Sequence, residues 1–131
     1  LFNFKLPANT VDVAAIRPEP NVIYEKFREW PDKLAEVKEG DRVYSRGRTS
    51  GEREGVVRDV HASAVVEWAP NKYAIFEDCI LLEMLTQPGD SGSAVVSDKG
   101  WVGLVFAGDP SNRIGLAVKA VNILRWLAGA R

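Results

Sequence analysis

The strongest constraint on the fold of this chain is a series of short β-type runs from residue 42 onward, each bounded by glycine or charged turn residues. Short runs at this spacing are typical of an antiparallel barrel or sandwich. We therefore expect an all-β fold. The runs are Arg42–Ser45, Gly55–Val60, Ser63–Trp68, Cys79–Met84, Ser93–Ser97, Trp101–Phe106 and Ile114–Val118.

A helix is predicted only at the C-terminal end. Apolar residues recur at helical spacing between residues 119 and 128, and Gly129 stands where such a helix would end. We expect one amphipathic helix over Lys119–Ala128, packed on the barrel. The apolar positions that predict its packed face are Ala120, Leu124, Leu127 and Ala128.

The first forty residues have a different character. Val11–Ile16 has the pattern of a strand, and several prolines and charged residues follow it. Proline interrupts regular structure, so this second stretch is predicted to be a connection with one or two helical turns over Val22–Trp30. We expect residues 17–38 to link a partial first unit to the barrel.

Composition excludes several classes of function. The 131 residues suit one domain at most, with 46% hydrophobic and 27% charged residues. Lys and Arg number 17 against 18 Asp and Glu, with no basic stripe, so nucleic acid is not expected as a partner. The single cysteine, Cys79, and single histidine, His61, cannot form a disulfide or a Cys/His zinc site. No metal or cofactor is expected.

The apolar runs are too short for a membrane-spanning helix, which needs about 20 residues. Neither disulfides nor Asn-x-Ser/Thr acceptor sites mark the sequence for an oxidising compartment. A cytoplasmic location is therefore favoured, and a membrane is not expected as a partner.

The most informative segment surrounds Ser91, in the sequence Gln-Pro-Gly-Asp-Ser-Gly-Ser-Ala-Val-Val at residues 87–96. The serine stands on a turn between two β-type runs. Gly89 and Gly92 permit backbone angles closed to other residues. The amides around Ser91 can then converge on one point, as the binding of an oxyanion requires.

Two other interpretations of this segment are possible. Glycine and serine are common turn residues, so the segment could be a turn without function. A nucleophile elbow of the α/β-hydrolase type would need glycine in place of Ser93 and a helix over Ala94–Val96, where the sequence predicts a strand. The elbow is therefore the weaker alternative.

With its neighbours, this segment resembles the chymotrypsin/trypsin-like serine proteases, in particular their disulfide-free bacterial and fungal members. The likeness extends from Asp12 nearly to the end of the chain, with its segments in the family's order. It implies the C-terminal antiparallel β-barrel of a two-barrel fold, followed by a C-terminal α-helix. The matching segments are Asp12–Ile16, Gly47–Gly51 with Gly55–Val56, Gly89–Ser93, Val102–Gly108, Ile114–Val118 and Val121–Leu127.

The resemblance also implies a domain layout and residue roles. Residues 1–16 would end the first barrel, 17–38 would link the barrels, and 39–131 would form the second barrel and helix. Ser91 would be the nucleophile, and the backbone N–H groups of Gly89 and Ser91 would form the oxyanion hole. Asp12 would orient the catalytic histidine, although an aspartate before a strand can also simply end a turn.

The sequence departs from the family in its histidine. The family places this residue before the aspartate, and residues 1–11 contain none. His61 falls between two β-type runs, where a surface or turn role is the better expectation than that of general base. Since the sequence begins at Leu1 without methionine, we expect a cut or processing site there, with an N-terminal fragment supplying the histidine.

Two functions remain open from sequence. The first is a serine endopeptidase acting on proteins or peptides and completed by that N-terminal fragment. The second is a catalytically dead protease-like module that binds a partner through the former substrate cleft. Retention of Ser91 between its glycines favours the enzyme, and the missing histidine favours the binding module.

The resemblance places Leu85 at the base of the pocket for the side chain that precedes the cleaved bond. Thr86 and a run on the cleft strand would line the pocket, which would then be open and uncharged. A small to medium apolar side chain is expected there. Leu85 could instead belong to the core, and Asp109 could add a charge if its loop folds into the pocket. The cleft-strand residues are Phe106, Ala107 and Gly108.

Overall fold

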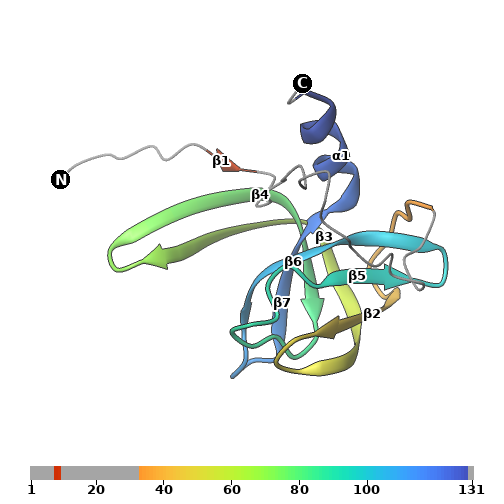
Figure 1. Cartoon of the computed structure of the whole chain (residues 1–131), viewed down its shortest axis with the longest axis horizontal. Coiled ribbons are helices and arrows are strands. Elements are labelled where there is room, and N and C mark those ends of the chain that lie inside the picture. Colours follow the sequence, from red (N-terminus) through yellow and green to blue (C-terminus); the bar gives the residue numbers. More distant parts are fainter. Residues whose placement is uncertain (1–7, 10–32, 130–131) are drawn as a thin grey trace, which may run out of the picture.

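The computed structural model describes residues 8–9 and 33–129 (Figure 1). Strands make up most of this part of the chain, and a helix follows the last strand. The elements are β1 (Ala8–Asn9), β2 (Arg42–Gly47), β3 (Gly51–Ala69), β4 (Lys72–Glu83), β5 (Ala94–Ser97), β6 (Gly100–Asp109), β7 (Ile114–Lys119) and α1 (Ala120–Gly129).

Strands β2 to β7 form a closed antiparallel barrel. Their order is β4-β3-β2-β5-β6-β7, and β4 also pairs with β7, so the sheet closes on itself. β1 lies outside this ring, parallel to β4. The predicted antiparallel barrel with a C-terminal helix is confirmed.

The barrel interior is filled by apolar side chains that alternate along the strands. In β2, for example, residues alternate between exposed and buried, with Val43 fully buried. This two-residue period is that of a strand with one face on a core. The core cluster comprises Val43, Val57, Ile80, Leu82, Met84, Val95, Val102, Val105 and Ala117.

The runs predicted at Gly55–Val60 and Ser63–Trp68 belong to one strand, β3, which is 19 residues long. The prediction of a break between them was wrong. Register shifts between Val57 and Ala64 show bulges, and a bulge bends a strand without ending it. The predicted turn near Asn71 is confirmed, with a φ of 59° at that residue.

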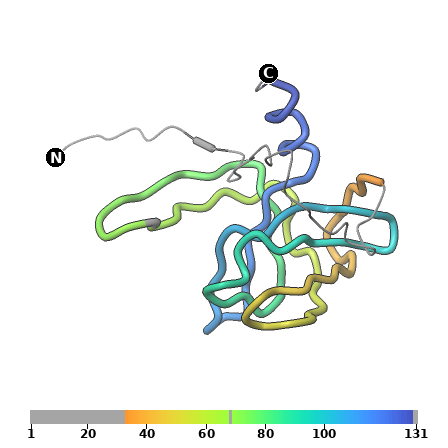
Figure 2. Tube along the Cα trace, viewed as in Figure 1, coloured from red at the N-terminus to blue at the C-terminus, as the bar shows by residue number. Residues whose placement is uncertain are grey.

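The hairpin of β3 and β4 is longer than the barrel. β4 pairs with β7 only over residues 80–83, whereas its pairing with β3 continues to Lys72. Figures 1 and 2 show the distal end of the hairpin projecting away from the barrel. There β4 pairs with β1 instead, through Ile75 and Phe76.

The segment just before the barrel lies against β6. The N–H of Ala35 donates to the carbonyl oxygen of Trp101 at 2.8 Å, and the N–H of Trp101 donates to the carbonyl of Lys33 at 2.8 Å. Ala35 and Val37 pack against the core cluster. The rest of the predicted linker, the strand Val11–Ile16 and the helical turns at residues 22–30 lie outside the described residues, so the domain boundaries stay a prediction.

Helix α1 begins one residue later than predicted and packs through a different face. Its buried residues are Ala120, Asn122 and Ile123, whereas Leu124 and Leu127 are exposed. The predicted packed face is therefore wrong beyond the first turn. The helix continues directly from β7 and leads away from the barrel, so only its first turn meets the core (Figure 1).

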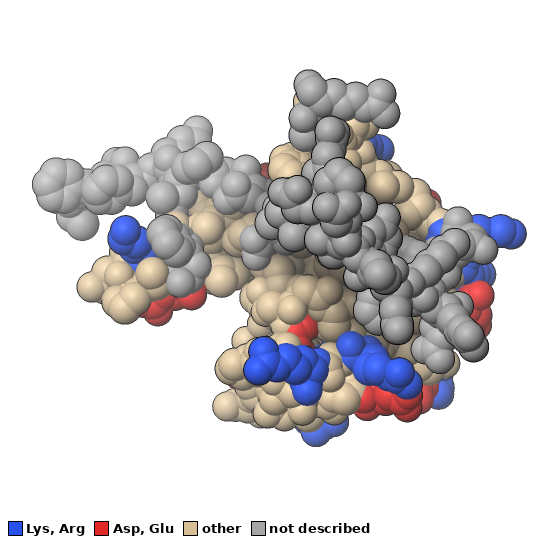
Figure 3. All heavy atoms as spheres, in the orientation of Figure 1, with Lys and Arg blue, Asp and Glu red and all other residues tan. Residues whose placement is uncertain are grey.

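Charges of both signs lie beside each other on the surface. On the face shown in Figure 3, basic and acidic side chains are interspersed around the barrel, without an extended area of one sign. None of the described helices is long and apolar enough to cross a membrane.

Strands β6 and β7 lie close together at Gly103, and this contact gives the first prediction. A Cβ atom there would lie 2.1 Å from the carbonyl oxygen of Val118, which is backbone and cannot rotate away. We expect Gly103→Ala to lower the free energy of unfolding by about 1–3 kcal/mol through overpacking. Urea denaturation of the chain measures this change.

The control is Gly129→Ala, because nothing lies within 4 Å of a Cβ atom at this helical position. That variant should be neutral or more stable by up to about 1 kcal/mol, since alanine favours a helix over glycine. Equal stability of the two variants would contradict the close approach of β6 and β7.

Candidate active site

Ser91 lies on the loop between β4 and β5, with its side chain exposed to solvent. Its hydroxyl donates a long hydrogen bond of 3.5 Å to the carbonyl oxygen of Phe106 on β6. The following residues tie the loop to the same strand. The N–H of Gly92 donates to the carbonyl of Val105 at 2.7 Å, and the N–H of Val105 donates to the carbonyl of Ser93 at 2.9 Å.

The backbone of this loop requires glycine on both sides of the serine. Gly89 has a φ of 99° and Gly92 a φ of 89°, in a region that residues with side chains rarely adopt. Among the described residues, the N–H groups of Gly89 and Ser91 have no hydrogen-bond partner, whereas that of Asp90 donates to the carbonyl of Gln87 at 3.0 Å. Two backbone donors of the Ser91 loop therefore stay available.

Asp90 anchors the loop to the turn between β2 and β3. Its side chain is buried, and one carboxylate oxygen accepts the N–H groups of Thr49 at 3.0 Å and Ser50 at 2.9 Å. The other accepts the Ser50 hydroxyl at 2.6 Å and the N–H of Gln87 at 2.9 Å. Burial alone would raise the pKa of Asp90. The hydrogen bonds lower it by a larger amount, so the pKa of Asp90 lies well below its ordinary value.

Arg53, on β3, is the buried cation beside this carboxylate. Its Nη1 atom lies 3.7 Å from Asp90 Oδ2, and the two side chains are 5% and 0% exposed. The guanidinium also donates to the carbonyl of Leu85 at 2.6 Å and to the hydroxyls of Ser45 at 3.2 Å and Ser93 at 3.3 Å. Burial lowers the pKa of Arg53 below its ordinary value, and the negative charge of Asp90 partly offsets this effect. One side chain therefore links two strands to both ends of the Ser91 loop.

Arg53 was not predicted as a site residue, although the alternation of side chains along β3 indicates that it faces inward. Glu52 and Glu54 form exposed ion pairs with Arg46 and Arg42 on β2. Side chains alternate across a strand, so the residue between two outward glutamates must face inward. An inward arginine needs a buried carboxylate, and this requirement could have directed the search to Asp90.

The structure brings part of the predicted substrate pocket together. Thr86 is buried against β6, and a Cβ atom on Gly108 would lie 2.6 Å from the Cβ of Thr86. Leu85 is half-buried beside it, and Ala107 is half-buried against the second core cluster. The ring of Phe106 packs on another aromatic side chain, Phe76, at a centroid distance of 4.6 Å. Their role in binding substrate stays a prediction.

Asp109, which could have added a charge to that pocket, holds its own turn. Its carboxylate accepts the N–H of Ser111 at 3.1 Å and the side-chain amide of Asn112 at 2.6 Å. These contacts fix the β6–β7 turn. Its carboxylate is exposed to solvent there.

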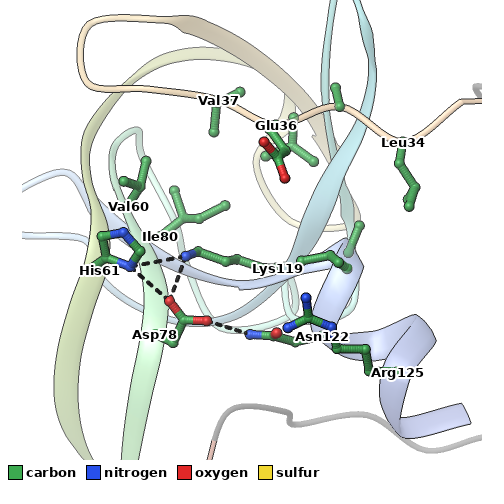
Figure 4. A pocket seen from close by; sticks show the side chains of 14 residues that line it. Leu34, Glu36, Val37, Val60, His61, Asp78, Ile80, Lys119, Asn122 and Arg125 are labelled. Carbon is green, nitrogen blue, oxygen red and sulfur yellow. Dashed lines mark hydrogen bonds and ion pairs between the residues drawn. The ribbon is translucent and has the colours of Figure 1, made fainter.

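His61 is exposed, as expected, but it lies within β3 and not on a turn. Its Nδ1 atom is 2.9 Å from Asp78, which also accepts Lys119 Nζ at 2.6 Å and the Asn122 amide at 3.0 Å (Figure 4). Burial alone would raise the pKa of Asp78. The hydrogen bonds from Asn122, Lys119 and His61 lower it by a larger amount, so the pKa of Asp78 lies below its ordinary value. In the described part of the chain, no hydrogen bond joins His61 to Ser91.

These polar residues line a cavity of about 360 Å³ between β3, α1 and the segment before the barrel (Figure 4). Apolar side chains from Val37, Ile80 and Val102 complete its walls. Ser91 is not one of the lining residues, so the only histidine of the sequence belongs to a different site from the serine.

Neither an ionised cysteine nor a cluster of metal ligands is found in the described ranges. Burial raises the pKa of the Cys79 thiol to about 11, so this side chain is a protonated core residue at neutral pH. Among residues 8–9 and 33–129, no three histidine, cysteine, aspartate or glutamate side chains converge as metal ligands would.

Comparison with known proteins decides the family. The family model described as Trypsin matches residues 3–127. The chain belongs to the trypsin family. This confirms the resemblance seen in the sequence, and within the family's pattern the exposed serine between two glycines of positive φ is the candidate nucleophile. No curated protein matches the chain.

Solved structures share the fold of this trypsin-family chain at low sequence identity. Chymotrypsin from Cellulomonas bogoriensis matches with a TM-score of 0.64 and 17% identity, over 72% of this chain and 51% of that one. Protease A from Thermobifida fusca matches with a TM-score of 0.62 and 19% identity, over 72% of this chain and 50% of that one. A glutamic acid specific serine protease that uses a histidine triad in substrate binding gives 0.66 and 16%, over 97% and 62%. The chain thus spans about half to three fifths of these proteins.

The buried carboxylate of this trypsin-family chain gives the second prediction. Asp90→Asn leaves the Arg53 cation buried without its counter-charge, and breaking such a pair costs about 3–5 kcal/mol. The free energy of unfolding in urea should fall by that amount. In the control, Glu54→Gln, an exposed ion pair is lost, and the cost should stay below about 1 kcal/mol.

The stability of the wild type and of Asp90→Asn can also be compared across pH. Because the pKa of Asp90 is lowered by folding, the folded chain resists protonation that the unfolded chain accepts near pH 4. The stability due to Asp90 is therefore full above about pH 5 and is lost as pH falls. Asp90→Asn should lack this part of the acid slope. An unchanged slope would mean that the carboxylate is not held as described.

Proposed function

We propose that this chain carries the nucleophile and oxyanion donors of a serine endopeptidase, with Ser91 attacking the substrate. The observation that carries the proposal is the Ser91 loop. This loop carries an exposed hydroxyl and two backbone N–H groups without partners in the described chain, and it contains two glycines of positive φ. Membership of the trypsin family supports peptides as the substrates.

In the proposed reaction, a general base removes the proton of the Ser91 hydroxyl as its oxygen attacks the carbonyl carbon of the scissile bond. The carbonyl oxygen gains negative charge and is bound by the N–H groups of Gly89 and Ser91. The carbon–nitrogen bond then breaks, the amine leaves with the proton, and water releases the acyl group from Ser91. Loss of one oxyanion donor lowers such rates by about 10²–10³.

The general base is proposed to come from a polypeptide other than these 131 residues. The only histidine of the sequence, His61, is paired with Asp78 in the cavity that Ser91 does not line. Asp12, which is proposed to orient the histidine, lies outside the described residues. Mass analysis of purified material tests for a second, histidine-bearing polypeptide that accompanies this chain. The expected cytoplasmic location stays a prediction.

A catalytically dead binding module is the second candidate. The absence of a histidine at Ser91 favours it. The unpartnered N–H groups beside the serine favour the enzyme, because a module that only binds a partner has no need of them. Chemical reactivity of Ser91 separates the two functions.

The third prediction concerns that reactivity. The natural assembly is this chain together with the proposed histidine-bearing polypeptide. We expect a fluorophosphonate probe to label this assembly at Ser91, where the serine oxygen displaces fluoride from phosphorus. Ser91→Ala should abolish both labelling and peptide cleavage with little change in stability, because the side chain is exposed and leaves no cavity. In the control, Ser111→Ala, an exposed turn serine is removed, and labelling should be unaffected.

Labelling of Ser91→Ala at the wild-type rate would contradict the assignment of the nucleophile. A wild-type assembly that contains the histidine-bearing polypeptide and still fails to react would favour the binding module instead.

The fourth prediction concerns the side chain that precedes the cleaved bond. The residues proposed for its pocket, Leu85, Thr86 and Gly108, carry no charge, and Asp109 is held in its own turn. A buried cation without a partner pays several kcal/mol, whereas each buried methylene gains about 0.8 kcal/mol. Profiling of a peptide library should show preference for small to medium apolar residues. A dominant Lys or Arg signal would contradict this pocket.

A further inference from the structure

A hydroxyl from the β2–β3 turn contacts the peptide bond just before the nucleophile motif. Thr49 Oγ1 donates to the carbonyl oxygen of Pro88 at 2.6 Å. This is a short hydrogen bond between two loops that are 39 residues apart in the sequence. It acts on the Pro88–Gly89 peptide, whose nitrogen is one of the two proposed oxyanion donors.

The geometry of a peptide bond makes this contact informative. A trans peptide is planar, so its C=O and N–H groups point in opposite directions, and no cis peptide occurs in the described residues. When the carbonyl of Pro88 points to Thr49, the N–H of Gly89 must point away from the β2–β3 turn. That leaves the N–H available to the substrate.

Nothing on Gly89 itself would hold the peptide in this orientation. Its φ of 99° is open to glycine, and glycine readily adopts other values as well. The approach is also very close, because a Cβ atom on Gly89 would lie 2.1 Å from Thr49 Oγ1. The N–H of Asp90 closes a turn around this peptide by donating to the carbonyl of Gln87 at 3.0 Å, and within that turn the hydroxyl of Thr49 holds the peptide's own carbonyl.

Thr49 is itself well fixed. Its backbone N–H donates to the buried carboxylate of Asp90 at 3.0 Å, and the N–H of Ser50 donates to the same oxygen at 2.9 Å. The hydroxyl of Thr49 thus lies on a turn that is hydrogen-bonded to Asp90 of the Ser91 loop. The position of Thr49 therefore depends on that of Asp90.

We propose that Thr49 is a positioning residue for the oxyanion hole, whose hydroxyl holds the Pro88–Gly89 peptide with the N–H of Gly89 turned toward the substrate. The inference rests on the proposed function, because Gly89 must be an oxyanion donor for the orientation to affect catalysis. Without the hydroxyl, the peptide can rotate and withdraw one of the two donors.

The test compares two variants of similar size in the natural assembly. Thr49→Val removes the hydroxyl and keeps the shape, whereas Thr49→Ser keeps the hydroxyl. We expect Thr49→Val to slow fluorophosphonate labelling and kcat by about 10- to 100-fold with KM nearly unchanged. This is less than the about 10²–10³-fold cost of removing an oxyanion donor, because the peptide still adopts the productive orientation part of the time. Thr49→Ser should stay within about threefold of wild type. Thermal unfolding checks that each variant is folded, and Thr49→Ala replaces Thr49→Val if the latter is not.

Labelling of the hydroxyl-free variant at the wild-type rate would overturn the proposal. An equal loss in the valine and serine variants would also overturn it, since the hydroxyl would then not be the cause. A crystal structure of Thr49→Val provides a readout independent of activity. A rotated Pro88–Gly89 peptide supports the role of Thr49 even if wild-type protein is unreactive, in which case only the proposed function fails. An unrotated peptide overturns the role of Thr49.

Discussion

The buried pair of Arg53 and Asp90 is the interaction on which the arrangement around Ser91 depends. Neither charge is tolerable alone in the interior, and together with their hydrogen bonds they join the β2–β3 turn, the end of β4 and the Ser91 loop. Such a pair forms only when the barrel strands are already in register. The backbone geometry at Ser91 is therefore a consequence of barrel closure, and the loop does not need to be stable by itself.

This arrangement divides the chain into two chemically different regions. One region presents the Ser91 hydroxyl and two backbone donors on a loop fixed from beneath by a buried ion pair. The other, at the start of α1, places His61 beside Asp78 and Lys119 around a separate cavity. In the function we propose, the chain supplies the nucleophile and the oxyanion donors, and the base must reach Ser91 from outside these residues.

Local patterns of strands, turn residues and a glycine-flanked serine predicted an antiparallel barrel or sandwich, the C-terminal helix and the exposed serine. The family resemblance then favoured the barrel. Prediction from sequence failed where the outcome depends on distant contacts. The bulges that carry β3 through His61 are set by pairing with β4, and the packed face of α1 depends on where the helix leaves the barrel. Likewise, Arg53 meets Asp90 across 37 positions of sequence, so only alternation along β3 could have suggested it.

A double-mutant cycle between Arg53 and Asp90 tests most directly whether this pair organises the Ser91 loop. The free energy of unfolding is measured for the wild type, Arg53→Met, Asp90→Asn and the double variant. Each single change leaves a buried partner unsatisfied, so the double variant should cost much less than the sum of the two, with a coupling of about 2 kcal/mol or more. Costs that add to within about 0.5 kcal/mol would contradict the account.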